Sequence, residues 1–198
     1  MKAIFIGFML VSTIGMARMN GEAIAMGDLK GKKIVMIIAR ENFRDEELNV
    51  PLAIFTKAGA EVTVASPSLS PAKGKLGAVV KPDILYSDID PAAYDAVVFV
   101  GGPGAVQYLN DPRAHRIARE TLGAGRVLAA ICVAPAILAN AGVLKGKKAT
   151  VFPSDQDALV RGGARYTATG VEVDGTIVTA DGPQSAAPFA NAIVKLLK

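Results

Sequence analysis

Short apolar runs alternate along this chain with longer segments in which apolar residues recur every three or four positions. The runs are typical of strands buried on both faces of a parallel sheet, and the periodic segments are typical of helices that cover such a sheet. Strands are predicted at 32–39, 60–66, 95–100 and 126–131. Helices are predicted over 45–58, from Asp111 onward and over 186–197.

Turn and capping residues support these boundaries. Asp45 is expected to cap the first helix, and Asp111-Pro112 provides an N-cap followed by proline at the first helical position. Asp174-Gly175, between two alternating runs, predicts a β-hairpin. Residues 75–90 contain two short β-like pieces and predict a small hairpin at the margin of the sheet. The pattern as a whole predicts an α/β fold with a mainly parallel sheet between two layers of helices.

Composition limits the number of domains and the possible partners. With 198 residues, 51% of them hydrophobic and 20% charged, the chain is long enough for one domain with a continuous core. Its 22 basic and 18 acidic residues are scattered rather than gathered into a basic patch, so nucleic-acid binding is not expected. One cysteine and one histidine cannot form a disulfide or a structural zinc site, and we expect neither a metal nor an organic cofactor.

The first 30 residues are treated as a separate N-terminal apolar segment, followed by one domain over 31–198. The stretch from Ala3 to Ala17 is apolar except for Ser12 and Thr13, which is too short for a helix that spans a membrane. It resembles the hydrophobic region of a signal peptide, and an N-terminal extension of the fold is the alternative. Export and a cytoplasmic location therefore both stay open.

The only cysteine lies where a strand is expected to turn into a helix. Cys132 has Ala130 two positions before it and Ala134 two positions after it, and such small residues allow the sharp turn of a nucleophile elbow. At the start of a helix the thiolate is favoured, so the pKa of the thiol is expected to fall. The alternative is a buried cysteine that only fills the core.

Two further loops follow predicted buried strands and are expected to meet this cysteine. The glycine-rich loop 101–104 can direct backbone N–H groups at a reacting atom, although an ordinary tight turn explains it equally well. The acidic run 45–47 begins the first helix and can simply serve the helix dipole. Neighbouring helical residues point about 100° apart, so Glu46 and Glu47 cannot both face the cysteine.

Together these segments resemble the ThiJ/PfpI superfamily, over residues 31–198. The resemblance is carried by ENFRDEELNVPLAIFTKAGAEVTVAS, YDAVVFVGGPGAVQYL, AAICVAPAIL and VEVDGTIVTADGPQSAAPFANAIVKLL. It implies a flavodoxin-like three-layer sandwich, of the class I glutamine amidotransferase type with a nucleophile elbow, and a homodimer. It also implies that Cys132 is the elbow cysteine and Glu47 the protonated acid beside it, with backbone amides at Gly101, Gly102 and Val133 facing the site.

The chain departs from that pattern in its histidines. PfpI-type proteases carry a histidine directly after the cysteine, where this chain has Val133, and deglycase-like members carry one after the next strand, where it has Phe152. The only histidine, His115, is expected on the surface of a helix between arginines. The expected Cys-His dyad is therefore missing, which disfavours peptide hydrolysis.

Three functions follow from these residues and the resemblance. The first is a cysteine-dependent enzyme of the glyoxalase or deglycase type, or a protein that responds to oxidative stress, in which Cys132 and Glu47 act on a small reactive carbonyl compound such as methylglyoxal. The second is a non-catalytic stress chaperone or redox sensor, which would explain the missing histidines. The third is a PfpI-like cysteine peptidase.

Overall fold

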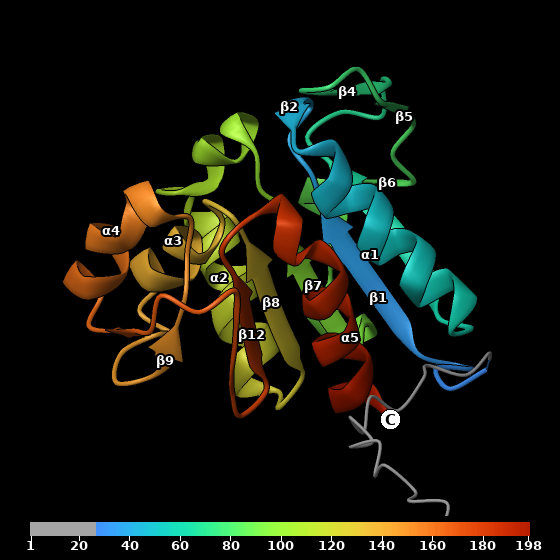
Figure 1. The fold of residues 1–198 in the computed structure, drawn as a ribbon. Helices are drawn as coiled ribbons and strands as arrows, with labels where there is room; N and C mark the ends of the chain where they lie inside the picture. Colours follow the sequence, from blue (N-terminus) through green and yellow to red (C-terminus); the bar gives the residue numbers. More distant parts are fainter. Residues whose placement is uncertain (1–26) are drawn as a thin grey trace, which may run out of the picture.

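A seven-stranded sheet runs through the middle of the molecule in the order β11-β12-β8-β7-β1-β3-β6 (Figure 1). The structure is a computed structural model and describes residues 27–198. Six strands are parallel, and β11 alone pairs antiparallel, with β12. The strands are β1 (Lys33–Ile37), β3 (Glu61–Ser66), β6 (Ile84–Leu85), β7 (Ala96–Phe99), β8 (Val127–Ile131), β11 (Val171–Asp174) and β12 (Ile177–Ala180).

The four predicted strands are confirmed as β1, β3, β7 and β8, which are neighbours in the sheet. Their runs are apolar because each strand is covered on both faces. In β1, Ile34 and Met36 point into one core, whereas Val35 and Ile37 point into the other. This alternation is the expected consequence of the two-residue period of a strand.

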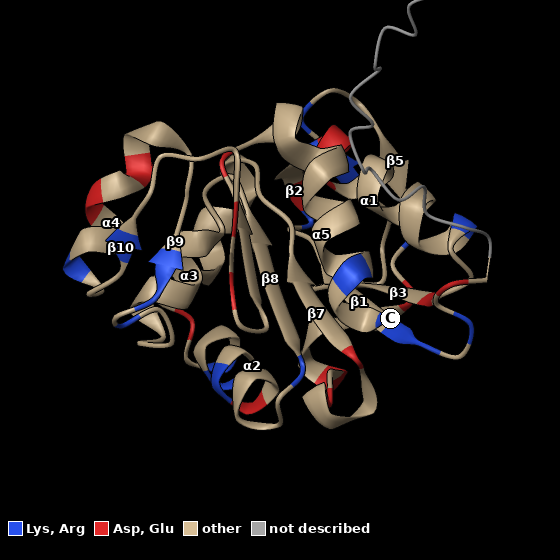
Figure 2. Cartoon of the chain, turned by 60° about the horizontal axis from the view of Figure 1, so that its bottom comes forward, with Lys and Arg blue, Asp and Glu red and all other residues tan. Residues whose placement is uncertain are grey.

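Helices fill the two outer layers, as predicted. One face of the sheet is covered by α1 (Asp45–Lys57) and α5 (Ala186–Leu197), which lie side by side. The other face is covered by α2 (Pro112–Gly123) and α3 (Pro135–Asn140), with α4 (Gln156–Arg161) next to α3. Basic and acidic residues are interspersed on α2 and on α4 (Figure 2).

Two small sheets and several single turns of helix complete the domain. The hairpin predicted within 75–90 is wrong, because its two β-like pieces do not pair with each other. The first, β5 (Val79–Val80), pairs antiparallel with β4 (Ala72–Gly74) in a separate sheet that also contains β2 (Glu41–Phe43). The second, β6, pairs parallel with β3 at the edge of the main sheet. The other small sheet pairs β9 (Lys148–Ala149) with β10 (Arg165–Tyr166). The 3₁₀ helices are η1 (Tyr86–Asp88), η2 (Pro91–Ala93), η3 (Pro103–Tyr108), η4 (Pro153–Asp155) and η5 (Pro183–Ser185).

Two of the three predicted turn and cap features are confirmed, and one is wrong. Asp111 caps α2 by accepting a hydrogen bond of 2.8 Å from the backbone N–H of Arg113. Asp174-Gly175 connects β11 and β12 as a hairpin. Asp45, in contrast, is the first residue inside α1 rather than its cap, because its carboxylate is turned away from the helix and accepts hydrogen bonds from the β4–β5 loop.

The turn before β1 belongs to the packed domain. Leu29 is fully buried in the core beneath α1, and its N–H donates a 2.8 Å hydrogen bond to Ala58. Asp28 forms an ion pair of 2.9 Å with Lys198 at the end of α5. Residues 27–30, which the sequence analysis assigns to the N-terminal segment, thus include side chains that pack against the domain. The rest of the expected N-terminal segment, residues 1–26, lies outside the described residues.

Between Gly27 and Lys198 no helix is both long and apolar enough to cross a bilayer.

We expect a chain that begins at Met26 to keep the thermal stability of the full-length protein, because residues 27–198 supply the sheet and both cores. Leu29→Ala in the same shortened chain should lower the melting temperature by about 5 to 15 °C, since removing a buried leucine costs about 2 to 5 kcal/mol. Thermal unfolding followed by circular dichroism measures both. A large loss of stability in the unsubstituted shortened chain would show that the preceding residues contribute to the core.

Candidate active site

Cys132 occupies a sharp turn between β8 and α3. Its φ angle is +64°, in the left-handed region that residues other than glycine rarely adopt. The turn is held from both sides, because the Cys132 N–H donates to Ala180 at 2.9 Å and its carbonyl accepts from the N–H of Phe152 at 2.9 Å. Ala130 and Ala134 are fully buried on either side of the turn, where larger side chains would collide. The thiol itself is half-buried.

Glu47, in the first turn of α1, is the carboxylate that lies beside this cysteine. Its side chain is fully buried, and Gly101 lies against both residues. A β-carbon on Gly101 would stand 2.5 Å from Oε2 of Glu47 and 2.6 Å from the Cys132 β-carbon. No side chain fits between them, so glycine at position 101 permits the close approach. Glu46 instead forms a bidentate ion pair with Arg44, at 2.8 and 3.1 Å.

The environment of Glu47 favours its neutral form. Burial raises the pKa of its carboxyl group from 4.5 to about 7. Within residues 27–198 neither carboxyl oxygen has a hydrogen-bond partner of ordinary distance and angle. The Cys132 thiol and the Gly101 amide still lie close enough to offset part of the rise in pKa. Glu47 is thus a carboxyl group that can hold or release a proton near neutral pH.

The expected fall in the thiol pKa is not what the structure shows. Burial, together with the negative charge of Glu47, raises the pKa of the Cys132 thiol, although the backbone amides of Gly102 and Val133 act in the opposite direction. Cys132 precedes the first residue of α3, and α3 is only six residues long. The helix dipole therefore does not outweigh burial, and the thiol stays mainly protonated near neutral pH.

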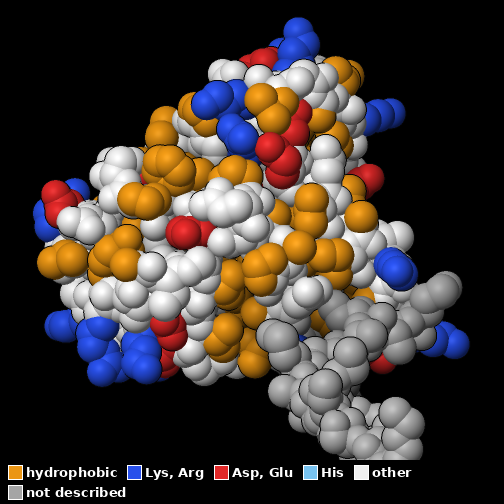
Figure 3. Space-filling view, in the orientation of Figure 1, with side chains coloured by type: hydrophobic (Ala, Val, Ile, Leu, Met, Phe, Trp, Pro, Cys, Tyr) orange, Lys and Arg blue, Asp and Glu red, His pale blue; other side chains and the backbone are white. Residues whose placement is uncertain are grey.

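A cavity of about 450 Å³ opens onto these residues at the carboxyl ends of the strands. Its lining residues are Arg44, Glu47, Lys75, Gly102, Pro103, Val106, Cys132, Val133, Phe152, Asp155, Pro183 and Gln184. All the residues expected at the site line this cavity except Gly101, which lies directly behind Glu47 and Cys132. In Figure 3 basic and acidic side chains lie next to one another at the top of the face shown, where α1 begins and β4 and β5 lie in Figure 1.

Four polar lining residues were missed from the sequence: Arg44, Lys75, Asp155 and Gln184. Only Arg44 had a usable signal, since it directly precedes the acidic run that begins α1. Val133 and Phe152, at the two positions of the expected histidines, both line the cavity. His115 lies away from it, with Nε2 2.8 Å from the carbonyl oxygen of Leu109. In the described part of the chain, no three His, Cys, Asp or Glu side chains are grouped so as to hold a metal ion.

The fold and the cysteine elbow define a class of α/β proteins, and comparison with known proteins identifies the family. The model of the DJ-1/PfpI family matches residues 32–196. A crystal structure of a ThiJ/PfpI domain protein from Brachyspira murdochii superposes with a TM-score of 0.81 at 36% identity, over 85% of this chain and 97% of that one. The chain therefore belongs to the DJ-1/PfpI family and has its flavodoxin-like α/β fold.

Curated relatives of this chain include one without an assigned function and two with enzyme names. An uncharacterized protein of Methanocaldococcus jannaschii is 36% identical over 201 residues, which cover all of this chain and 97% of the relative. A deglycase of Pyrococcus horikoshii is 34% identical over 84% of this chain and 99% of its own length. A glutathione-independent glyoxalase of Caenorhabditis elegans is 26% identical over 84% and 89%, respectively. These named relatives are a deglycase and a glyoxalase, which is the general type of function expected from the sequence.

We expect Glu47→Gln to stabilise the protein increasingly as the pH rises. A glutamate in water has a pKa of 4.5, whereas the pKa of Glu47 in the folded protein is about 7. Between these pH values the folded protein binds a proton that the unfolded chain does not. The free energy of unfolding therefore falls as the pH rises through this window. Above pH 7 the loss is fully present, at about 3 kcal/mol. A neutral glutamine avoids it.

Melting temperatures of Glu47→Gln and the unsubstituted protein, measured from pH 4.5 to 8, test this expectation. The advantage of the variant should be small at pH 4.5 and reach about 5 to 10 °C at pH 8. Glu46→Gln is the matched control, because Glu46 is adjacent to Glu47 in the sequence but is paired with Arg44 at the surface and is not buried. A difference that stays constant over this pH range would contradict a raised pKa at Glu47.

Proposed function

We propose that this protein converts a reactive carbonyl compound by chemistry of the glyoxalase or deglycase type, with Cys132 as nucleophile and Glu47 as the group that moves the proton. The observation that carries the proposal is a fully buried carboxyl group, with a pKa near 7, in contact with a thiol whose cavity is lined by no histidine. General acid–base groups work best when their pKa lies close to the working pH. Glu47 thus takes the place that histidine has in a Cys-His dyad.

The first step in our proposal is addition of the thiol to an aldehyde. The sulfur of Cys132 forms a bond to the aldehyde carbon of a 2-oxoaldehyde while the thiol proton passes to the Glu47 carboxylate. The carbonyl oxygen takes a proton from Glu47 and becomes the hydroxyl of a hemithioacetal. Because the pKa of the thiol is raised, proton transfer to Glu47 during the attack removes the need for a stable free thiolate.

The next steps move hydrogen between two adjacent carbons. Glu47 removes the proton from the hemithioacetal carbon, and the ketone oxygen takes up a proton, which gives an enediol. The neighbouring carbon then takes up a proton while the hydroxyl of the former hemithioacetal carbon loses one, which leaves a 2-hydroxy thioester. Water then cleaves the thioester, releases a 2-hydroxycarboxylate and restores the thiol. Methylglyoxal and water thereby give lactate and one proton, with no external oxidant or reductant. Each transfer uses the same carboxyl group beside the same sulfur.

We expect the purified protein to form lactate from methylglyoxal, with a rate that rises as the pH passes about 7, because Glu47 must begin as a carboxylate. Cys132→Ser should abolish the activity, and Glu47→Gln should lower it about 100-fold or more. Enzymatic lactate determination measures both. Iodoacetamide should still alkylate Cys132 in Glu47→Gln at pH 8 at least as fast as in the unsubstituted protein, since the charge that raises the thiol pKa has gone. Lactate formation by Cys132→Ser at the unsubstituted rate would refute the proposal.

We expect no hydrolysis of casein or of short peptides, because neither Val133 nor Phe152 can act as the base that peptide cleavage requires. Hydrolysis that is lost in Cys132→Ala would instead support a cysteine peptidase. Suppression of client aggregation that persists in Cys132→Ala, in the absence of lactate formation, would support a non-catalytic chaperone.

The expected homodimer is a further proposal, and light scattering during size-exclusion chromatography tests it.

A further inference from the structure

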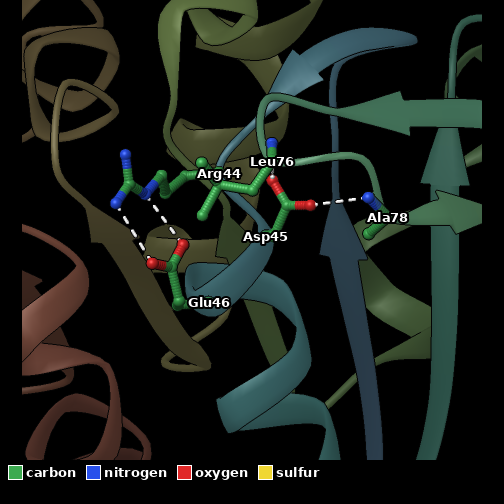
Figure 4. A network of polar contacts seen from close by, with 5 residues as sticks. All are labelled: Arg44, Asp45, Glu46, Leu76 and Ala78. Carbon is green, nitrogen blue, oxygen red and sulfur yellow. Dashed lines mark hydrogen bonds and ion pairs between the residues drawn. The ribbon is translucent and has the colours of Figure 1, made fainter.

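Asp45, the first of the three acidic residues that begin α1, positions the β4–β5 loop at the cavity. Asp45 is buried, and its two carboxylate oxygens accept hydrogen bonds of 2.8 Å from the N–H of Leu76 and 2.7 Å from that of Ala78 (Figure 4). These bonds lower the pKa of its carboxyl group, although burial acts against them. Asp45 therefore stays ionised and ties the loop to the start of the helix.

Backbone contacts complete this attachment. The N–H of Lys75 donates a hydrogen bond of 2.8 Å to the carbonyl of Phe43. A β-carbon on Gly74 would stand 2.6 Å from the carboxylate carbon of Asp45, so the loop can approach the carboxylate only with glycine at that position. The loop is therefore held in place at Gly74 and Leu76, the two residues that flank Lys75. The side chain of Lys75 lines the cavity.

Lys75 is the cation of the cavity that has no partner. The Arg44 guanidinium, the other cation in the lining, is engaged by both carboxylate oxygens of Glu46 on the side away from Asp45 (Figure 4). In the chain from Gly27 to Lys198, by contrast, no carboxylate forms an ion pair with Lys75. Besides Glu47, the lining contains one acidic residue, Asp155. It directly precedes α4, which lies at the opposite side of the molecule from β4 and β5 (Figure 1).

We propose that Lys75 makes the Cys132 cavity selective for carbonyl compounds that also carry a carboxylate group. This inference rests on the proposed function for its reaction, and it adds the substrate class. Lysine offers one compact positive charge on a flexible stem, which suits a single carboxylate. The other cation of the lining, Arg44, is occupied by Glu46, and the Gly102 and Val133 amides are directed at the sulfur. Asp155 opposes anions from the other side, so a bound carboxylate should point to Lys75.

Two alkylating agents of similar size test this selectivity without any need for turnover. Iodoacetate carries a carboxylate, whereas iodoacetamide is neutral, and both alkylate Cys132. The ratio of their rate constants, divided by the same ratio for N-acetylcysteine in the same buffer, gives the anion preference of the cavity. All variants are compared at one pH. The ionised fraction of Cys132 affects both reagents equally and cancels in the ratio, and the negative charge of Glu47 contributes the same background to every variant.

We expect Lys75→Met to lower this preference about two- to fivefold, the size of effect typical of one partly exposed charge. Lys75→Arg should retain it, and Asp155→Asn should raise it. Lys73→Met is the matched control, because Lys73 is exposed on the same hairpin but does not line the cavity. Asp45→Asn should lower the preference in part, since the loop then loses its ionised anchor. High salt should reduce the preference of the unsubstituted protein.

An unchanged preference in Lys75→Met, or an equal fall in Lys73→Met, would overturn the proposal. Circular dichroism of each variant establishes that it is folded, and Lys75→Arg provides a second reading if Lys75→Met is unstable. Failure to form lactate from methylglyoxal, with the anion preference present and lost in Lys75→Met, would refute the proposed function alone. Lactate formation without any anion preference would refute the role of Lys75 alone.

Discussion

The site depends on one unfavourable burial, that of the Glu47 carboxyl group. Taking a carboxylate out of water without a hydrogen-bond partner is costly, and the group responds by holding its proton up to about pH 7. The same burial brings it against Cys132, whose own pKa is raised. The charge of Glu47 raises the pKa of the thiol, and the nearby thiol offsets part of the rise in the pKa of Glu47. The burial lowers the stability of the folded protein as the pH rises towards 7, and the proposed function uses the same carboxyl group to move protons.

The neighbouring backbone is arranged so that this pair can form. The elbow holds Cys132 at a positive φ angle, and Gly101 leaves room for the carboxyl group and the sulfur to meet behind the glycine-rich loop. These contacts join α1, the end of β7 and the end of β8, which come from distant parts of the chain. Parallel strands bring their carboxyl ends to one edge of a sheet, so the fold supplies the meeting point. The side chains then determine which chemistry occurs there.

Much of this arrangement could be predicted from the sequence because it follows from local rules. The four central strands are largely apolar since both of their faces are buried. Helix geometry allows only one of Glu46 and Glu47 to face the cysteine, and the family resemblance identified it as Glu47. The errors concern properties that arise only after folding. Asp45 was expected to cap a helix, but the β4–β5 loop offers it two backbone donors from 31 and 33 residues away. The thiol pKa was expected to fall, but burial depends on elements that the local sequence does not reveal. The two- and three-residue strands of the small sheets were missed for the same reason.

The attachment of the β4–β5 loop also bears on how proteins of this kind can diverge. Asp45 and Gly74 hold the loop through backbone N–H groups and close packing, and neither contact depends on which side chain occupies position 75. That position can accept substitutions while the loop keeps its place and the Cys132–Glu47 pair stays intact. With the role that we propose for Lys75, a single codon change there would alter the ligand preference without rebuilding the site around Cys132. Evolution of selectivity in this scaffold can therefore proceed in small steps that each leave a working protein.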